Sequence, residues 1–168
     1  MRTVLVLALF SLLTACQAAP PELTEADRQA IAAEISQAAA ASMEPFAQPQ
    51  DLETALGFYV EDAGDYFVGE AATGVFNLTT YGSSQELRDR LGRLVDNRLG
   101  TTIEITDDRV AVLSADHAIQ VLAANYAITN LEGETRTGYR MINTNVWVRE
   151  NGAWKVLHFH QSFQAPTE

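Results

Sequence analysis

The sequence has a single cysteine, Cys16, among its 168 residues. One thiol forms no internal disulfide, builds no cysteine-rich metal site and carries no dithiol redox chemistry. The chain is also poor in basic residues, with 11 Lys plus Arg against 22 Asp plus Glu, whereas binding to nucleic-acid phosphates needs a basic face. These deficits exclude a disulfide scaffold and a thiol oxidoreductase, and we expect no nucleic-acid partner.

The common cofactor and catalytic motifs are missing as well. The sequence contains no nucleophile elbow, phosphate-binding loop, dinucleotide fingerprint or zincin helix, so we expect no cofactor. With 5 prolines and 10 glycines, it also lacks the composition of a disordered or collagen-like chain. What remains is a folded protein of single-domain size.

An apolar run near the start of the chain is too short to span a bilayer, which takes about 20 apolar residues. Arg2 precedes the run Val4–Phe10, and small residues follow it, as in a secretory signal. The next residues, Leu13-Thr14-Ala15-Cys16, resemble the bacterial lipobox, in which the cysteine is acylated and becomes the mature N-terminus. Cleavage near Ala18-Ala19 by an ordinary signal peptidase is the alternative.

The leader therefore predicts an address in the bacterial cell envelope. We expect a signal peptide over 1–15, lipidation at Cys16 and a tether over 16–23. Gln17 after the cysteine favours the outer membrane, with the domain facing the periplasm. The lipid would be the protein's only contact with the membrane.

Three helices are predicted ahead of the strands. Thr24 with Asp27 three residues on is a capping box, and apolar residues then recur at helical spacing until Pro45. Ser83 and Glu86 form a second capping box before an amphipathic segment that we expect to stop at Gly100. The predicted helices span 24–44, 51–59 and 83–99.

From Thr101 onward the pattern alternates as in β-strands. Asn151-Gly152 between alternating segments is a strong hairpin signal. Helices followed by strands predict an α+β domain with its helices packed on one face of an antiparallel sheet. The expected strands are 66–68, 102–113, 117–129, 135–149 and 153–163, and the expected divisions are an N-terminal helix and linker over 24–50 and the main domain over 51–168.

The last hairpin resembles that of a known superfamily. It carries a spaced set of aromatic, glycine, histidine and serine residues: Trp147, Gly152, Trp154, His158, His160 and Ser162. The set resembles the C-terminal hairpin of the nuclear transport factor 2-like superfamily, especially its SnoaL-like members and the association domain of calcium/calmodulin-dependent kinases. The resemblance covers about 51–163. It implies a strongly bent sheet wrapped round a helix into a cone, with a pocket at the open end and frequent pairing into homodimers through the sheet.

Strand alternation and the resemblance together predict which residues line a ligand pocket. On the last strand, alternation places Phe159 on one face and Val156 on the other. The kinase association domains have arginines at positions matched here by Leu122, Asn145 and Gln161, all neutral, so we expect an uncharged pocket for a neutral small molecule. The arginines of the third helix are expected on the surface. The predicted lining is Tyr66, Leu122, Tyr126, Asn143, Asn145, Phe159, Gln161 and Phe163.

Two classes of function remain open. The first is a non-enzymatic module that binds a small molecule or a protein partner. The second is a cofactor-independent isomerase or lyase, because the resemblance implies a carboxylate in the cone that takes a proton from carbon. Asp65 or Asp62 matches that base by position, and Tyr126 or Tyr59 is the expected oxyanion donor.

The histidines of the last strand give a weaker chemical signal. His158 and His160 share one face, and they would hold a metal only if a third ligand such as His117 converged on them. A structural role on the sheet is the simpler interpretation, so we expect no metal.

Overall fold

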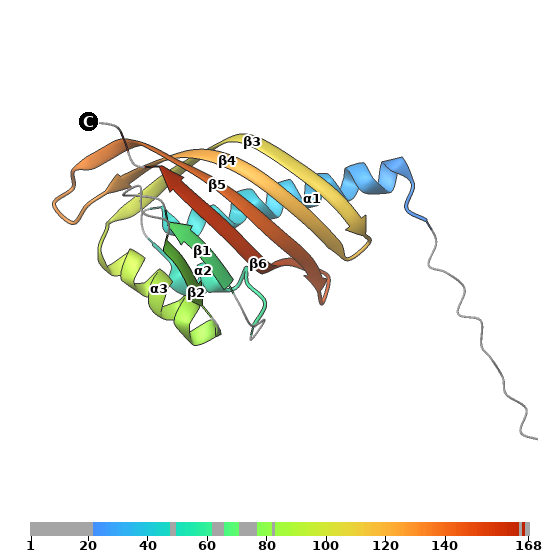
Figure 1. Ribbon diagram of the computed structural model, residues 1–168, viewed down its shortest axis with the longest axis horizontal. Helices are drawn as coiled ribbons and strands as arrows, with labels where there is room; N and C mark the ends of the chain where they lie inside the picture. Colours follow the sequence, from blue (N-terminus) through green and yellow to red (C-terminus); the bar gives the residue numbers. More distant parts are fainter. Residues whose placement is uncertain are drawn as a thin grey trace, which may run out of the picture.

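The alternating C-terminal half forms a curved, four-stranded antiparallel sheet in the order β3-β4-β5-β6 (Figure 1). The computed structural model describes residues 22–47, 50–61, 66–70, 77–81, 83–164 and 166. The α+β architecture predicted from the sequence is confirmed. The helices are α1 (Glu25–Met43), the 3-10 helix η1 (Glu44–Phe46), α2 (Leu52–Leu56) and α3 (Ser84–Asp96), and the strands are β1 (Tyr66–Glu70), β2 (Asn77–Tyr81), β3 (Gly100–Ser114), β4 (His117–Thr129), β5 (Thr135–Glu150) and β6 (Ala153–Gln164).

The helices begin where their capping residues predict. The Thr24 hydroxyl accepts the Asp27 backbone N–H, and the Asp27 carboxylate accepts the Thr24 backbone N–H in return. Ser83 caps α3 by accepting the Glu86 N–H at 3.2 Å. Each cap satisfies backbone donors that have no partner inside the helix. None of the helices in the described part of the chain is long and apolar enough to cross a membrane.

Two helix ends differ from the prediction. The third helix ends at Asp96, and Gly100 opens β3 instead of stopping the helix. The side-chain amide of Gln50 donates to the carbonyls of Val95 and Arg98 at 3.1 and 2.6 Å, which satisfies acceptors at this end. The second helix stops at Leu56 because the chain just beyond it bonds to β6. These endings depend on contacts between distant segments, which helical periodicity does not report.

The core lies between the helices and the concave inner face of the sheet. α1 contributes Ile31, Ile35 and Ala39, all buried, and α3 contributes Leu87 and Leu91. The sheet adds buried side chains that alternate along β4, β5 and β6. Each large apolar side chain buried in this way contributes about 1.5–3 kcal/mol, so the sheet and the helices stabilise one another.

A smaller sheet of two strands, β1 and β2, lies beside β6 (Figure 1). The strand expected at 66–68 is present as β1. The partner strand β2 was not predicted, because its five residues, Asn-Leu-Thr-Thr-Tyr, are too few and too polar to stand out as a strand.

A β-bulge at Leu157 changes which side chains of β6 face inward. Consecutive residues of β5 lie opposite His158 and Val156, so the register skips Leu157. Strict alternation placed Val156 and Phe159 on opposite faces, and that prediction was wrong. The extra residue brings both to the inner face, where both are buried, because a bulge shifts the phase of the pleat by one residue.

Candidate functional site

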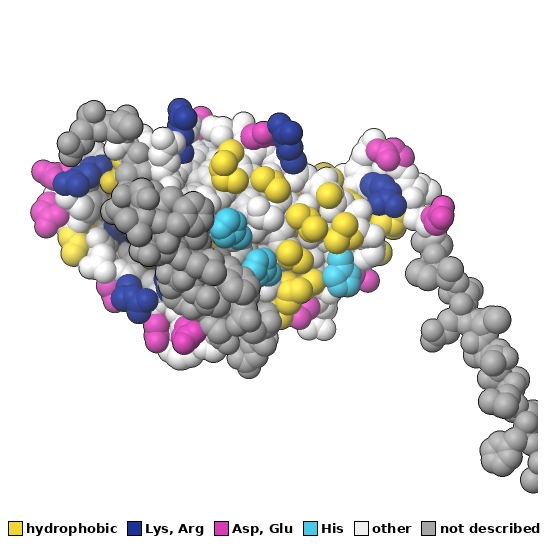
Figure 2. All heavy atoms as spheres, in the orientation of Figure 1, with side chains coloured by type: hydrophobic (Ala, Val, Ile, Leu, Met, Phe, Trp, Pro, Cys, Tyr) yellow, Lys and Arg dark blue, Asp and Glu magenta, His cyan; other side chains and the backbone are white. Residues whose placement is uncertain are grey.

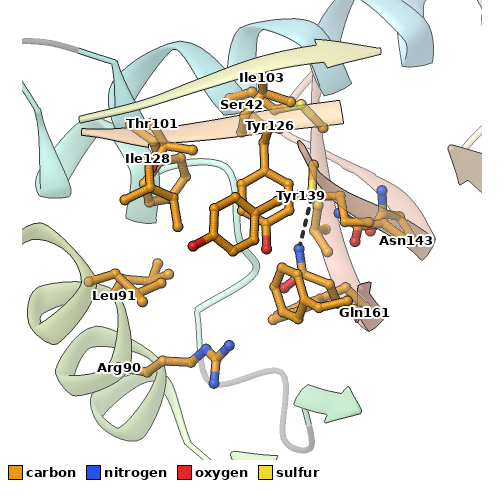
Figure 3. Close-up of a pocket in the computed structure, with 18 of the residues that line it drawn as sticks. Ser42, Arg90, Leu91, Thr101, Ile103, Tyr126, Ile128, Tyr139, Asn143 and Gln161 are labelled. Carbon is orange, nitrogen blue, oxygen red and sulfur yellow. Dashed lines mark hydrogen bonds between the residues drawn. The ribbon is translucent and has the colours of Figure 1, made fainter. Parts of the chain in front are cut away.

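A cavity of about 320 Å³ lies between α3, the C-terminal end of α1 with η1, and the inner face of the sheet. Its volume is at the lower end of the range for small-molecule sites. Figure 3 shows side chains from the helices and from the strands pointing into the same space. The cavity is therefore the hollow that the bent sheet was expected to leave.

Six of the eight predicted lining residues lie on its wall: Tyr126, Asn143, Asn145, Phe159, Gln161 and Phe163. Leu122 is completely buried in the core and is not among the lining residues. The side chain of Tyr66 lies outside what the structure describes, as do Asp62, Asp65 and Cys16. Tyr59, the alternative oxyanion donor, also lines the cavity.

Aromatic rings form one wall of the cavity. The rings of Tyr126 and Tyr139 stack with centroids 5.0 Å apart, and Phe163 meets Tyr126 edge-on at 5.8 Å. Tyr59 and Phe159 form a second pair with centroids 5.7 Å apart. In Figure 3 the hydroxyls of Tyr126 and Tyr139 point into the space between the sheet and α3. The wall thus offers flat apolar surfaces with phenolic donors at their tips.

Amide side chains form a second wall, contributed by the central strands. Asn145 donates to the Gln120 side-chain oxygen at 3.1 Å, which fixes its orientation. Gln161 lies opposite Asn143 in the sheet and donates to the sulfur of Met141 at 3.3 Å (Figure 3). The side-chain oxygen of Asn143 is buried and has no hydrogen-bond partner among the residues that the structure describes. Since buried acceptors are nearly always satisfied, a small turn of this side chain toward the cavity would let the oxygen accept a donor from a bound molecule.

Two arginines also line the cavity, and the expectation of an uncharged lining was wrong. Arg90 projects from α3 and is only 9% exposed, and Arg98 follows the end of the same helix. Sequence reasoning placed the arginines of this helix on the surface. The missed signal is spacing: Arg90 stands three residues after Leu87 and four before Leu94, on the helix's apolar face.

Arg98 sits in a partly desolvated position. Its guanidinium donates to the Thr101 hydroxyl at 2.9 Å. Burial is the main cause that lowers the pKa of Arg98 from its ordinary value; Tyr126 counteracts this effect, and the positive charge of Arg90 adds to it. Arginine nevertheless stays protonated in proteins. Among the residues that the structure describes, no carboxylate lies within ion-pair distance of Arg98.

The described lining contains no Asp, Glu or His. His158 and His160 project from the opposite face of β6, and His117 bonds through Nδ1 with the Ser114 hydroxyl at 3.0 Å. Within the described ranges, no three His, Cys, Asp or Glu residues come together as a metal site. The described wall therefore supplies cations, amides, hydroxyls and rings, which are groups for binding and for stabilising negative charge.

Comparisons with known proteins agree with this geometry. A family model described as a SnoaL-like domain matches residues 61–166. No curated protein matches the chain.

Several solved structures share the fold at low sequence identity. A protein of the NTF2-like family from Streptomyces avermitilis is 19% identical, with a TM-score of 0.67 over 84% of this chain and 99% of that chain. The hexachlorocyclohexane dehydrochlorinase LinA-type3 from Novosphingobium barchaimii LL02 is 17% identical, with a TM-score of 0.64 over 86% and 93%. An NTF2-like superfamily protein from Salmonella enterica serovar Typhimurium is 14% identical, with a TM-score of 0.65 over 84% and 96%. At these identities the likeness shows the cone-shaped fold alone.

Proposed function

The chain belongs to the SnoaL-like domain family, and we propose that it binds a small organic molecule in the cavity beneath its curved sheet. The observation that carries the proposal is a cavity of about 320 Å³ walled by aromatic rings, where the buried side-chain oxygen of Asn143 has no partner among the described residues. Apolar walls with a few convergent polar groups are the usual make-up of a ligand site. The proposed site agrees with the ligand-binding module expected from the sequence, except that its lining includes two arginines.

A neutral dye tests this proposal. We expect the full chain to bind N-phenyl-1-naphthylamine, which fluoresces in apolar surroundings, with one site per chain. Leu94→Trp fills the cavity from α3 and should weaken binding about tenfold, which corresponds to about 1.4 kcal/mol. Leu113→Trp is the matched control, because Leu113 lies on β3 outside the lining and is 59% exposed.

Both variants carry the same N-terminal segment, so dye taken up by lipid or detergent cancels between them. Circular dichroism shows whether each variant is folded, and Ile103→Phe fills the same cavity from β3 if Leu94→Trp does not fold. Equal dye binding by a folded cavity-filling variant and by the control would overturn the proposal. Mass spectrometry of molecules released from protein purified from its native envelope then identifies the natural ligand.

A second candidate function is a cofactor-independent isomerase or lyase. The observation that favours it is the Tyr126 hydroxyl, which points into a cavity that also holds Arg90 and Arg98 (Figure 3). These groups could stabilise an enolate oxygen after a carboxylate takes the proton from the neighbouring carbon. Asp65, outside the described residues, is the proposed base. If Asp65→Asn turned over a substrate of the unaltered protein at an unchanged rate, Asp65 would not be the base.

We also propose that the protein is anchored by lipid at Cys16. The support is the sequence pattern alone, a short apolar leader that ends in Leu-Thr-Ala-Cys. The full chain expressed in a Gram-negative host should incorporate labelled palmitate and sediment with the outer membrane, whereas Cys16→Ala should do neither. Release of the unaltered protein into the soluble periplasmic fraction would instead indicate ordinary signal-peptide cleavage.

A further inference from the structure

We infer that the cavity takes its ligand as an anion, namely a flat, mostly apolar carboxylate whose charged end meets Arg98 and Arg90. Its other end would donate a hydrogen bond to the side-chain oxygen of Asn143. This inference rests on the proposed function, since it names the class of molecule that the same cavity binds.

One end of the cavity is cationic. Arg98 is partly buried, and its guanidinium has one side-chain hydrogen bond, to the neutral hydroxyl of Thr101. A guanidinium carries five N–H donors, so most of its bonding capacity is unused by the described residues. Removing a cation from water without a counter-charge is costly. A bound carboxylate would supply that counter-charge through short, charge-assisted hydrogen bonds.

Arg90 strengthens the same end. It lines the same cavity as Arg98 and lowers the pKa of Arg98 through its positive charge. The two like charges repel each other, and an anion held near both would relieve that repulsion.

The setting of these two cations shows that they are not part of a basic surface. The whole chain carries a formal charge of −11, yet the described lining includes two arginines and no acid. Repulsion of an incoming anion by the distant acids is weak at physiological ionic strength, because charges more than about 8 Å apart are largely screened. The two arginines therefore make the described part of the cavity wall favourable to an anion.

The opposite end of the cavity selects a hydrogen-bond donor. Asn143 and Gln161 lie opposite each other on β5 and β6, and the side-chain oxygen of Asn143 accepts no bond from the described part of the chain. In Figure 3, Arg90 approaches from α3, Asn143 and Gln161 lie on the other side, and the rings of Tyr126 and Tyr139 lie between the two ends. A ring with a carboxylate at one end and a hydroxyl at the other matches this order of groups.

The test compares pairs of probes that share an aromatic frame and differ chiefly in charge. The anionic dye 8-anilino-1-naphthalenesulfonate is the sulfonated form of the neutral dye used above, and the neutral amide of 4-hydroxycinnamate is the matched partner of that carboxylate. We expect 4-hydroxycinnamate to displace either dye at about tenfold lower concentration than the amide does. Added salt should weaken binding of the carboxylate and leave binding of the amide unchanged.

Substitutions in α3 and just after it show which arginines cause the preference for the carboxylate. Arg98→Gln should reduce the preference for the carboxylate over the amide to about threefold or less, and Arg90→Gln should act in the same direction. Arg93→Gln is the control, because Arg93 is an exposed arginine of the same helix. Circular dichroism of each variant shows whether it is folded, so a misfolded variant is recognised.

The outcomes separate the inference from the function on which it rests. Binding of the neutral dye with no preference for the carboxylate would overturn the inference and leave the cavity a ligand site. A preference that survives in both Arg98→Gln and Arg90→Gln would also overturn it. Failure of the full chain to bind any probe would overturn the proposed function, and the inference with it.

Discussion

The indole N–H of Trp147 donates to the side-chain oxygen of Gln120 at 2.9 Å, and both side chains are fully buried. The same oxygen accepts from Asn145 on the cavity wall, while the Gln120 amide donates to Asp108 at 2.8 Å. One glutamine thus joins the largest core side chain to a residue of the site. Because both polar side-chain atoms of Gln120 have hydrogen-bond partners, burial of this amide leaves no unsatisfied polar atom in the core.

Replacing Gln120 by leucine should cost about 2–4 kcal/mol of unfolding free energy, because two buried donors and one carboxylate lose their partner. Urea unfolding followed by tryptophan fluorescence measures the loss. Gln85→Leu is the control: Gln85 is an exposed glutamine of α3 whose side chain donates to Asp89, one helical turn away. Its replacement should change stability by less than about 0.5 kcal/mol. Equal effects of the two substitutions would contradict this role of the buried amide.

Glu34 should make the protein's stability depend on pH. Its carboxylate accepts hydrogen bonds from the Trp154 indole at 2.9 Å and from Arg149 at 2.6 Å, which join α1 to the last hairpin. These bonds, that of Trp154 above all, lower the pKa of Glu34 from its ordinary 4.5. A group whose pKa is lowered by folding stabilises the folded state above its unfolded pKa, and this contribution is lost as pH falls through the folded pKa.

Glu34→Gln should therefore be less stable than the unaltered protein at pH 7, and the difference should shrink as the pH falls below 4.5. Urea midpoints measured from pH 7 to pH 3 give the comparison. Glu104→Gln, at an exposed position of β3, serves as the control. A constant difference between Glu34→Gln and the unaltered protein at every pH would show that the carboxylate's charge contributes nothing.

Two glycines should respond to alanine in opposite directions. Gly152 has a φ of +83° in the turn between β5 and β6, a conformation that strains a residue with a Cβ atom. Gly92 lies inside α3, where an added Cβ would meet the Leu52 side chain at an ordinary 3.8 Å. Gly152→Ala should lower the free energy of unfolding by about 1 kcal/mol or more, and Gly92→Ala should raise it by about 0.5–1 kcal/mol. Thermal melts of the two variants test the pair, and a stabilising Gly152→Ala would contradict the strain argument.

The outer face of the sheet should mediate pairing with a second copy of the chain. Figure 2 shows histidine and hydrophobic side chains gathered on one face of the molecule. On this face Val121 and Ile142 are 41% and 54% exposed, and Val121 lies in a row across the sheet with Thr144 and His160. Contiguous exposed apolar surface of this kind commonly marks an interface.

Light scattering should then give a homodimer that Ile142→Glu converts to a monomer. Leu131→Glu is the control, since Leu131 is equally exposed, at 57%, but lies in the turn between β4 and β5. A monomer at every micromolar concentration of the unaltered chain would remove this prediction.

Local sequence rules account for the elements that were predicted correctly. The capping boxes at Thr24 and Ser83 mark the starts of α1 and α3, and Asn151-Gly152 takes positive φ angles of 51° and 83° in its hairpin. Each of these features is fixed by residues within a few positions of one another. Strand β2 escaped prediction because a short polar strand exists only through its partner β1.

The composition of the site could be predicted only in part, for the same reason. Alternation along β5 and β6 correctly brought Asn143 and Gln161 to one wall. Arg90 and Arg98 were missed: the spacing of Arg90 from Leu87 and Leu94 places it on the apolar face of α3, whereas Arg98 lies beyond the end of α3 and follows no local pattern. Alternation also misplaced Val156, because a bulge at Leu157 changes the phase of the strand.

The sequence alone determined the types of the main elements, their order and the α+β class, because periodicity, capping and turn chemistry act between near neighbours. The bend of the sheet was expected only from the family resemblance. Tertiary structure decided the character of the cavity. Which side chains share a hollow depends on where a helix crosses the sheet and on a single extra residue in a strand. Both are settled by packing between segments far apart in the chain, and this packing placed two arginines where a neutral lining was expected.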